Sequence, residues 1–258
     1  THEHGNGAMG TLVKGRLETT DLPLEVGEVD IIVSEWMGYG LYYENMLTSV
    51  LHARDKYLNK TSGVLMPSEA TIYVDAMTAA GDEDRLGYWS DVYGFDMQEM
   101  RSMLIPEAQV QYVRGEDIIG SRCVAHVLDI GVAVDADLDF EAPFTVTIDR
   151  DEPELKAFVL SFDVLFGRGN LSAMEGNSTA VFQEQVLSTG PKAQATHWKQ
   201  TVLWLNPEHR VKVTKGTVLR GSVCYLRADD NKRDYDIVLR WFHPSTGKEH
   251  IQRYVLAS

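Results

Sequence analysis

The chain has 258 residues, which is enough for one large domain or for two ordinary ones with separate hydrophobic cores. Apolar residues make up 44% and charged residues 24%, and no run reaches the roughly 18 continuous apolar residues of a membrane span, so we expect a globular protein without a membrane partner. The net charge of −14 argues against direct binding to nucleic acid, because phosphate binding needs basic patches, and is compatible with a cationic substrate.

The first 66 residues have the pattern of an α/β unit. Residues 11–14 and 29–33 read as strands, and the second is a nearly continuous apolar run of the kind found in buried parallel sheets. Apolar residues recur at helical spacing over 44–58, which predicts an amphipathic helix, and strand character resumes over 64–66. Since two strands and a helix cannot bury an open parallel sheet, we expect further strands of this sheet to precede Thr1.

After Pro67 the pattern changes to short alternating runs separated by turn residues. Such runs at this spacing are typical of a β-sandwich or barrel, so we place the domain boundary near Pro67. The predicted strands cover residues 71–76, 123–130, 144–148, 158–166, 202–205, 218–226, 237–241 and 251–256. A helical segment over 82–103 interrupts the series.

Two features of the chain invite a functional interpretation that we do not adopt. Cys123 and Cys224 lie in strand-like runs, where each is best explained as a small buried hydrophobe, and we expect neither a disulfide nor a metal site. Residues 5–10 match G-x-G-x-x-G, but a nucleotide-binding loop needs a strand before it and a helix after it. Here nothing precedes the motif and a strand follows, so we expect a flexible turn.

Residues 34–47, with the sequence SEWMGYGLYYENML, carry the strongest chemical signal. They begin where a predicted buried strand ends, which is where open α/β sheets place their ligand crevice. Gly38 and Gly40 allow a sharp turn that can bring Glu35 and Glu44 to one pocket. A pair of carboxylates around a guanidinium can hold its donors bidentately. Without a cation between them, the two carboxylates favour general acid–base catalysis, as in a glycosidase. A further alternative is that Glu35 is an ordinary loop residue and Glu44 an ordinary acidic residue of a first helical turn.

Three segments resemble motifs of the protein arginine N-methyltransferases. Residues 34–47 closely resemble the double-glutamate loop of that family, and residues 195–201 (ATHWKQT) resemble its Thr-His-Trp loop. Residues 91–97 (DVYGFDM) look like its dimerisation arm. The motifs follow the family order and together span nearly the whole chain, and they are most similar to the type I enzymes, which make asymmetric dimethylarginine.

The resemblance implies an α/β + β architecture. Residues 1–66 would form the C-terminal part of a Rossmann-like methyltransferase sheet. Residues 67–258 would form a β-barrel or sandwich that binds substrate, with a helical dimerisation arm at about 82–106. The implied reaction transfers a methyl group from S-adenosylmethionine to a guanidino nitrogen of Arg/Gly-rich proteins and leaves S-adenosylhomocysteine, with no metal. The resemblance and the absence of targeting signals imply a cytoplasmic or nuclear homodimer.

The family roles carry over to individual residues. Glu35 and Glu44 would hold the substrate guanidinium, and a glutamate would accept the departing proton. His197 would be a catalytic proton relay, although its family partner, an aspartate near the N-terminus, has no counterpart here. Trp198 would line the arginine groove and Tyr39 would shape the pocket.

The resemblance also assigns residues to the cofactor. Residues 15–18 (GRLE) resemble the short motif whose glutamate binds the adenine of the cofactor, so Glu18 would accept that hydrogen bond and Leu17 would contact the ring. Met46 would shape the pocket around the transferred methyl. The glycine-rich loop of the family and its ribose-binding acidic residue have no counterpart, so we expect this chain by itself to bind S-adenosylmethionine poorly.

Two alternatives to an active methyltransferase stay open. A truncated, non-catalytic family member would act as a protein-binding or dimerisation module, and the absence of the cofactor-binding half favours it. A carboxylate-pair hydrolase would explain neither the Thr-His-Trp loop nor the arm, and binding of arginine without binding of sugar would exclude it.

Overall fold

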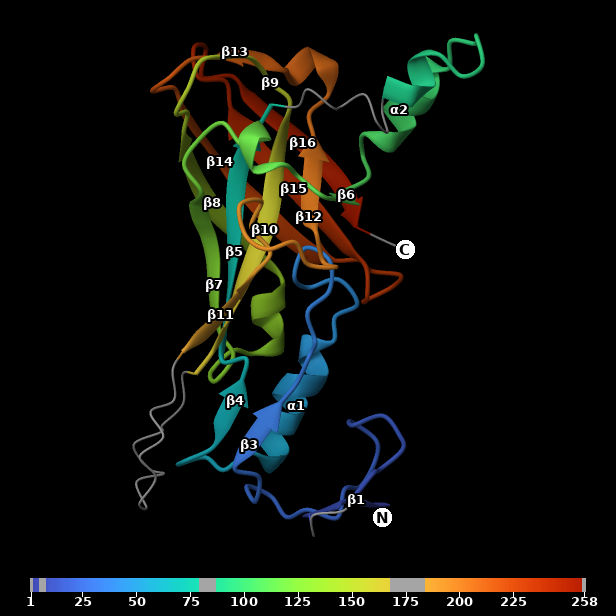
Figure 1. The fold of residues 1–258 in the computed structure, drawn as a ribbon, viewed down its shortest axis with the longest axis vertical. Coiled ribbons are helices and arrows are strands. Elements are labelled where there is room, and N and C mark those ends of the chain that lie inside the picture. The colour runs from blue at the N-terminus through green and yellow to red at the C-terminus, as the bar shows by residue number, and fades with distance from the viewer. Residues whose placement is uncertain (1, 5–7, 79–86, 168–183, 257–258) are drawn as a thin grey trace.

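The computed structural model describes residues 2–4, 8–78, 87–167 and 184–256 (Figure 1). The larger part is built from strands, and a small α/β unit lies at one end of the long axis, at the bottom of Figure 1. Each α-helix described, of 11 and 7 residues, is too short to cross a membrane.

The α/β unit consists of strand β3 (Ile31–Val33), helix α1 (Leu47–Tyr57) and strand β4 (Val64–Met66). The two strands pair in parallel, with Ile31 opposite Val64, which confirms the predicted α/β pattern. The helix begins at Leu47, three residues later than predicted, because Glu44 and Asn45 have φ angles of 74° and 53° in the left-handed region, outside the helical range.

Two predictions for this unit were wrong. Residues 11–14 form no strand. Strand β3 is not buried as a central parallel strand would be, since Ile31 and Val33 are 44% and 72% exposed. In the described residues β3 pairs with β4 alone. The other edge of β3 and part of its apolar surface therefore face solvent.

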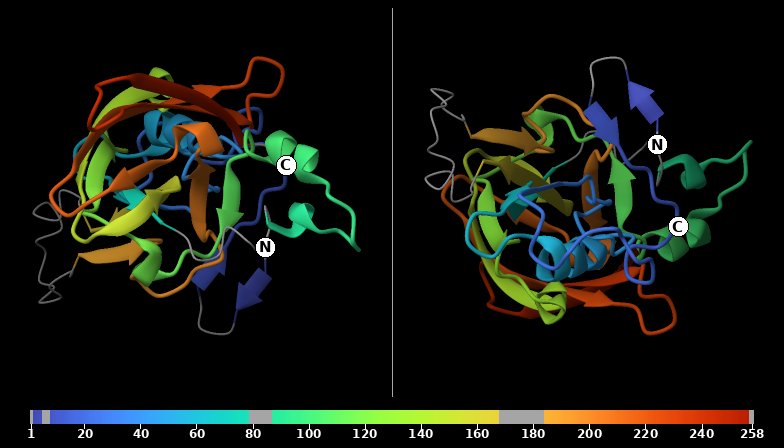
Figure 2. Two further views of the ribbon diagram at one scale, coloured as in Figure 1. Left: turned by 90° about the horizontal axis from the view of Figure 1, so that it is seen from above. Right: turned by 90° about the horizontal axis from the view of Figure 1, so that it is seen from below.

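The β domain contains two main sheets. The first has the order β6-β12-β10-β5-β7 with β11 pairing to β10, and the second has the order β16-β15-β14-β8. Figure 2, which looks along the long axis, shows the two sheets on opposite sides of the interior. Their strands are β5 (Glu69–Met77), β6 (Gln109–Gln111), β7 (Cys123–Asp129), β8 (Phe140–Thr147), β10 (Ala157–Phe166), β11 (Gln185–Ser188), β12 (Gln200–Trp204), β14 (Val218–Arg227), β15 (Tyr235–Phe242) and β16 (Glu249–Leu256).

This arrangement agrees with the sandwich form of the prediction. Within the described residues, the two sheets are joined near their edges only by isolated bridges, at Glu107–Val255 and Gly120–Ile148. No continuous ladder of paired strands runs from one sheet into the other there, so the described strands do not close one barrel. All eight predicted strands of this domain are present, and shorter strands that were not predicted add to them. These are β6, β11 and the pair β9 (Glu152–Leu155) and β13 (Val211–Val213).

Aromatic side chains fill the space between the sheets. Phe158 of β10 lies 5.1 Å from Phe144 of β8 and 6.0 Å from Trp241 of β15, measured between ring centroids. A second apolar cluster lies on the other face of the first sheet and includes Met77 and Val159. Each aromatic ring buries a large apolar area, so these contacts hold the sheets face to face.

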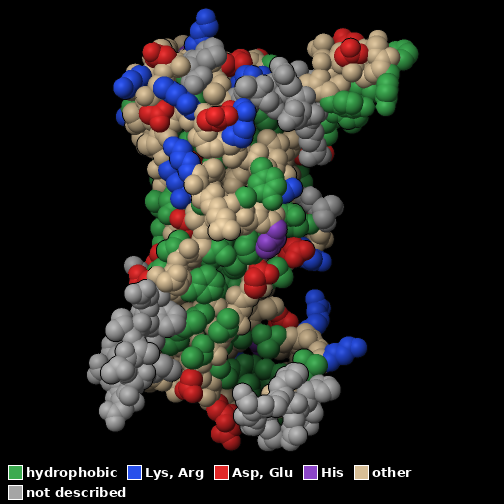
Figure 3. Space-filling view, viewed as in Figure 1, with side chains coloured by type: hydrophobic (Ala, Val, Ile, Leu, Met, Phe, Trp, Pro, Cys, Tyr) green, Lys and Arg blue, Asp and Glu red, His purple; other side chains and the backbone are tan. Residues whose placement is uncertain are grey.

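The predicted helical interruption is a projection with two short helical pieces, η1 (Gly87–Ser90) and α2 (Gln98–Leu104). Residues 82–86 of the predicted arm lie outside the described residues. The described part of the segment expected to be helical over 82–103 is not one continuous helix. A turn separates the two pieces, and in it Tyr93 has a φ of 54° and Gly94 a φ of 87°. Figure 3 shows hydrophobic side chains along the lower side of the projection.

Two remaining predictions concern the cysteines and the glycine motif. Cys123 and Cys224 are free thiols and are half-buried, so they are less enclosed than predicted. Strands β1 (His2–His4) and β2 (Ala8–Gly10) pair in antiparallel register, and residues 5–7 lie outside the described residues. Strand β1 therefore precedes the motif, residues 8–10 of the motif themselves form β2, and residues 11–14 form neither the strand that was predicted to follow nor a nucleotide-binding helix.

Candidate functional site

Residues 34–46, hereafter the glutamate loop, turn back sharply after β3. Gly38 and Leu41 exchange two backbone hydrogen bonds of 2.9 and 3.1 Å. A Cβ atom on Gly38 would lie 1.9 Å from the carbonyl oxygen of Tyr43, so this close approach requires glycine. The fold-back that the two glycines predicted is therefore confirmed.

A buried aromatic cluster anchors the loop to the β domain. Trp36 and Tyr42 are each 2% exposed, and the Tyr42 ring lies 6.0 Å from Tyr225 and 6.2 Å from Tyr235. Burial raises the pKa of the Tyr42 hydroxyl well above its usual range, so it stays protonated. The loop thus connects the α/β unit rigidly to the second sheet.

Glu44 sits at the end of this loop in an unusual backbone conformation. Its φ of 74° lies in the left-handed region, and its backbone N–H donates to the carbonyl oxygen of Arg233 at 2.8 Å. The Arg233 guanidinium also donates to Glu44 Oε1 at 3.0 Å. Two contacts from the turn between β14 and β15 therefore fix both the backbone and the carboxylate of Glu44.

Three of the predicted site residues meet in one cavity. Glu44, Met46 and Glu18 line an open cavity of about 480 Å³ together with Ser49 and Arg233. The Ser49 hydroxyl donates a hydrogen bond to the Glu18 carboxylate, and this bond lowers the pKa of Glu18. A Glu18 carboxylate that stays charged, close to a thioether, suits a ligand that presents hydroxyl groups and a positive charge.

Other predicted residues lie near the loop but outside the lining of this cavity. Glu35 is exposed, and Leu17 is half-buried. Tyr39 is 39% exposed and stacks on Tyr43 with ring centroids 6.1 Å apart. In the described residues the structure therefore brings Glu18, Glu44 and Met46 together, and it does not bring Glu35 into the same cavity.

The Thr-His-Trp segment contacts the glutamate loop directly. The Trp198 side chain is 8% exposed, and its Nε1–H donates to the carbonyl oxygen of Met37 at 2.7 Å. His197 is exposed, and its ring lies 3.8 Å from the Trp198 ring at 35°. The indole thus ties two segments that are 161 positions apart, and the imidazole remains accessible beside it.

Sequence reasoning missed Arg233 and Ser49. Arg233 belongs to a charged turn that reads as an ordinary hairpin connection, and Ser49 lies on the polar side of a helix. Nothing local distinguishes these residues, because Arg233 contacts Glu44 across 189 positions and Ser49 contacts Glu18 across 31.

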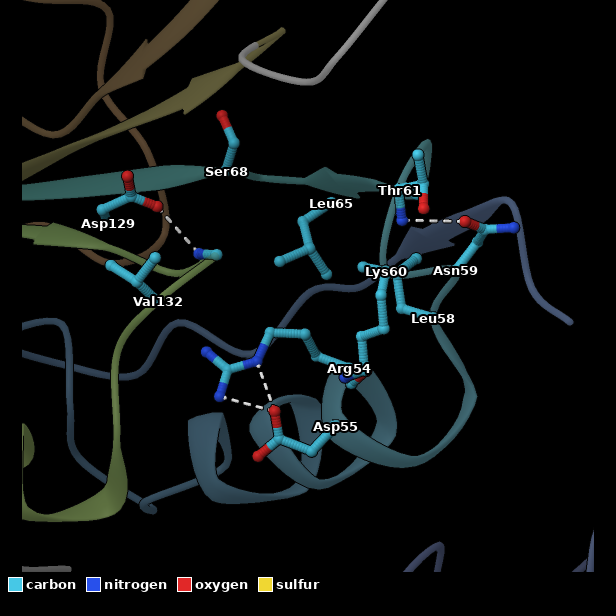
Figure 4. Close-up of a pocket in the computed structure, with 12 residues that line it drawn as sticks. Arg54, Asp55, Leu58, Asn59, Lys60, Thr61, Leu65, Ser68, Asp129 and Val132 are labelled. Atoms are coloured by element: carbon cyan, nitrogen blue, oxygen red, sulfur yellow. Dashed lines mark hydrogen bonds and ion pairs between the residues drawn. The ribbon is translucent and has the colours of Figure 1, made fainter. Parts of the chain in front are cut away.

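A second cavity, of about 500 Å³, lies at the junction between the α/β unit and the β domain (Figure 4). The buried Arg54 of α1 donates to the carbonyl oxygens of Ile130 and Ala133 at 2.6 and 2.7 Å and pairs with Asp55. The buried cation therefore has its hydrogen bonds satisfied, and it joins the helix to the β domain. We assign this cavity a structural role.

Metal ligation has no support in the part of the chain that the structure describes. Among those residues no three His, Cys, Asp or Glu side chains gather in a way that could hold an ion.

Comparison with known proteins places these features in context. A family model described as the arginine methyltransferase oligomerization subdomain matches residues 68–246. The chain is 39% identical over 232 residues to the probable protein arginine N-methyltransferase 1.2 of Arabidopsis thaliana, with 90% of this chain and 58% of that protein covered. It is 37% identical over 230 residues to protein arginine N-methyltransferase 1 of Dictyostelium discoideum, with 89% and 62% covered.

Solved structures show the same fold. A Trypanosoma brucei PRMT1 enzyme-prozyme heterotetrameric complex with AdoHcy matches with a TM-score of 0.83 and 28% identity, over 96% of this chain and 73% of that one. Arabidopsis thaliana protein arginine methyltransferase 10 matches in fold, with a TM-score of 0.73 and 24% identity, over 95% of this chain and 74% of that one. The chain spans 58% and 62% of the lengths of the two sequence relatives.

Proposed function

This chain belongs to the arginine methyltransferase family, and from that premise we propose that the protein methylates arginine side chains of other proteins with S-adenosylmethionine as the donor. The observation that carries the proposal is the placement of Glu44. Its carboxylate enters a cavity that also contains Glu18 and Met46, and a second chain segment holds it in place. The resemblance of the sequence assigns these same residues to the substrate and the cofactor.

The chemistry of a guanidinium explains why carboxylates are needed. Arginine stays protonated in proteins, so its nitrogens are poor nucleophiles unless the charge is drawn to one side. A carboxylate at the far nitrogens would localise the charge there and leave the near nitrogen richer in electrons. Glu44 lines the cavity and would take this role, and the resemblance assigns the second carboxylate to Glu35, which lies exposed outside the cavity lining. The sulfonium of the bound donor would supply the methyl group to this nitrogen, and a glutamate would accept the proton that the nitrogen loses. Positioning supplies much of the rate.

The side chains that line the cavity match the chemical groups of the proposed cofactor. S-adenosylmethionine supplies the methyl group when bound. The charged Glu18 carboxylate, held by Ser49, would accept a hydrogen bond from the adenine, with Leu17 against the ring. Met46 would contact the cofactor near the transferred methyl.

The remaining family residues have supporting places around the loop. Trp198 holds the glutamate loop through Met37, and its buried ring would form one wall of the arginine groove. Tyr39, partly exposed on that loop, would border the pocket, and the accessible His197 would relay a proton away from it. We further propose that the product is asymmetric dimethylarginine, because the loop most resembles that of type I enzymes, and that Arg/Gly-rich proteins are the substrates.

The projection of η1 and α2 supports a proposal about assembly. Tyr93 is 93% exposed, Phe95 72% and Met103 68%, and large apolar side chains exposed to this degree mark an interaction surface. We propose that this surface docks on a second copy to form a homodimer. The same surface favours the alternative function, a non-catalytic dimerisation module, and residence in the cytoplasm or nucleus suits either function.

The test is methyl transfer by the full-length natural protein from labelled S-adenosylmethionine to an Arg/Gly-rich peptide. Mass and fragmentation identify the product. We expect asymmetric dimethylarginine from the wild type and its loss in Glu44→Gln, with cofactor binding retained. Folded, cofactor-bound wild-type protein that transfers no methyl group would overturn the enzyme and favour the dimerisation module.

A further inference from the structure

A cavity of about 270 Å³ lies on the outer face of the first sheet, and its lining shares no residue with the Glu44 cavity. Strand β5 sends Val74 and Ala76 into the core between the sheets, so Asp75 points to the opposite face. Ile118, Pro191 and Ala193 contribute apolar wall to the cavity that Asp75 lines.

Asp75 is an unusual residue for a sheet surface. It is 3% exposed, and its Oδ2 atom has no hydrogen-bond partner among the described residues. Burial raises the pKa of its carboxyl to about 6, against the opposing positive charges of Arg122 and Lys192. At neutral pH the group is therefore mostly ionised, and a buried, charged oxygen that accepts no hydrogen bond is costly.

The neighbouring cations do not supply the missing hydrogen bond. The Arg122 guanidinium donates to Asp163 at 3.0 Å and to Ser161 at 3.1 Å, and it lies 3.5 Å from the centre of the Tyr73 ring. Lys192 lies on the exposed rim of the cavity. Among the described residues, Oδ2 of Asp75 therefore receives no hydrogen bond from the groups that line the cavity.

We propose that this cavity binds the cationic end of a basic side chain, a guanidinium or an ammonium, presented by a polypeptide. The charged N–H groups would donate to Asp75, and the apolar walls would pack against the methylene stem. Of the two cations in the lining, Arg122 is already paired with Asp163 and Lys192 is exposed on the rim, so Asp75 is the charge at the buried end of the cavity. The cavity lies below the roughly 300–1,000 Å³ of sites for drug-sized ligands, which suits one side chain. The net charge of −14 of the chain as a whole favours encounters with basic partners.

The test is an NMR titration of the full-length protein carrying Glu35→Gln and Glu44→Gln, which silence the proposed arginine clamp. The probe is arginine blocked at both ends as an acetyl amide, and its control is the equally shaped but neutral citrulline derivative. We expect saturable shifts of the Gly120 and Gly190 amides with the arginine probe. Affinity should fall by about tenfold or more in Asp75→Asn, as loss of a buried charged partner predicts.

A second variant protects the test against misfolding. Ala193→Leu changes an exposed residue of the rim and should weaken binding by filling the cavity. Equal binding of the arginine probe by the clamp-silenced protein and by both variants made in it, or equal binding of the citrulline derivative, would overturn the proposal. Agmatine carries the guanidinium without peptide groups, so binding of agmatine together with failure of the blocked arginine would show a small-molecule site and overturn the side-chain assignment. Because the clamp glutamates are absent throughout, a negative result here leaves the proposed methyl transfer unaffected.

Discussion

The guanidinium of Arg233 lies 3.0 Å from Glu44 Oε1, and the backbone carbonyl of Arg233 accepts the Glu44 N–H at 2.8 Å. The turn between β14 and β15 therefore shapes the proposed arginine clamp. The Arg233 guanidinium occupies one oxygen of the Glu44 carboxylate and leaves the other oxygen for a substrate. Arg233 acts here as a positioning residue.

Arg233→Ala should lower kcat/KM for methyl transfer by about tenfold, because a loosened carboxylate no longer orients the substrate. The melting temperature should change little, since the Arg233 side chain is 65% exposed and exposed ion pairs contribute little to stability. Lys232→Ala is the matched control, because that neighbouring cation pairs with Asp229. Equal losses in both variants would show a general effect of charge and not positioning of Glu44.

Trp198→Phe should destabilise the protein more than Trp204→Phe does. Both indoles are buried, but Trp198 donates to Met37, whereas Nε1 of Trp204 has no partner in the described residues. Both variants lose ring volume, and only the first leaves a buried carbonyl unpaired, so we expect a difference of about 1–3 kcal/mol in the free energy of unfolding. Urea denaturation measures it. Equal costs would mean that the Trp198 hydrogen bond adds nothing to stability.

Asp75→Asn should stabilise the unliganded protein at neutral pH. The pKa of Asp75 is about 6 in the folded protein against the ordinary value of 3.8 for a solvated aspartate, so the folded state binds this proton more tightly than the unfolded chain does. The charged carboxylate therefore lowers the free energy of unfolding. This penalty is fully present above pH 6 and disappears as the pH falls towards 3.8. We expect a gain of up to about 3 kcal/mol at pH 7.5 that is mostly lost at pH 4. A gain that is independent of pH in denaturation experiments would contradict the titration of Asp75.

Phe95→Asp should weaken self-association of the full-length protein without lowering its melting temperature. Phe95 is 72% exposed on the projection, so a charge there removes apolar contact with a partner and leaves the core intact. Sedimentation velocity measures the shift towards monomer. Phe242→Asp, at an exposed position of β15, is the control and should leave the association unchanged. Dimers of undiminished stability in Phe95→Asp would exclude the projection as the interface.

The sequence by itself determined the local elements and the candidate motif. Periodic apolar residues predicted α1 and the long strands of the β domain, because burial of one face imposes a period of 3.6 or 2 on the chain. Gly38 and Gly40 predicted the turn of the glutamate loop. The resemblance of residues 34–47 and 195–201 then predicted the family that the comparisons confirm.

The tertiary structure decided which residues share a site. Arg233 reaches Glu44 across 189 positions and Trp198 reaches Met37 across 161, and neither contact leaves a local pattern in the chain. The start of α1 at Leu47 likewise depends on the left-handed backbone of Glu44, whose N–H bonds to that distant turn. Asp75 occupies an outward position of a strand, where polar residues usually meet water, and the segments folded over it bury it. Periodicity specifies which face a residue occupies, whereas its partners depend on segments that only the folded chain brings together.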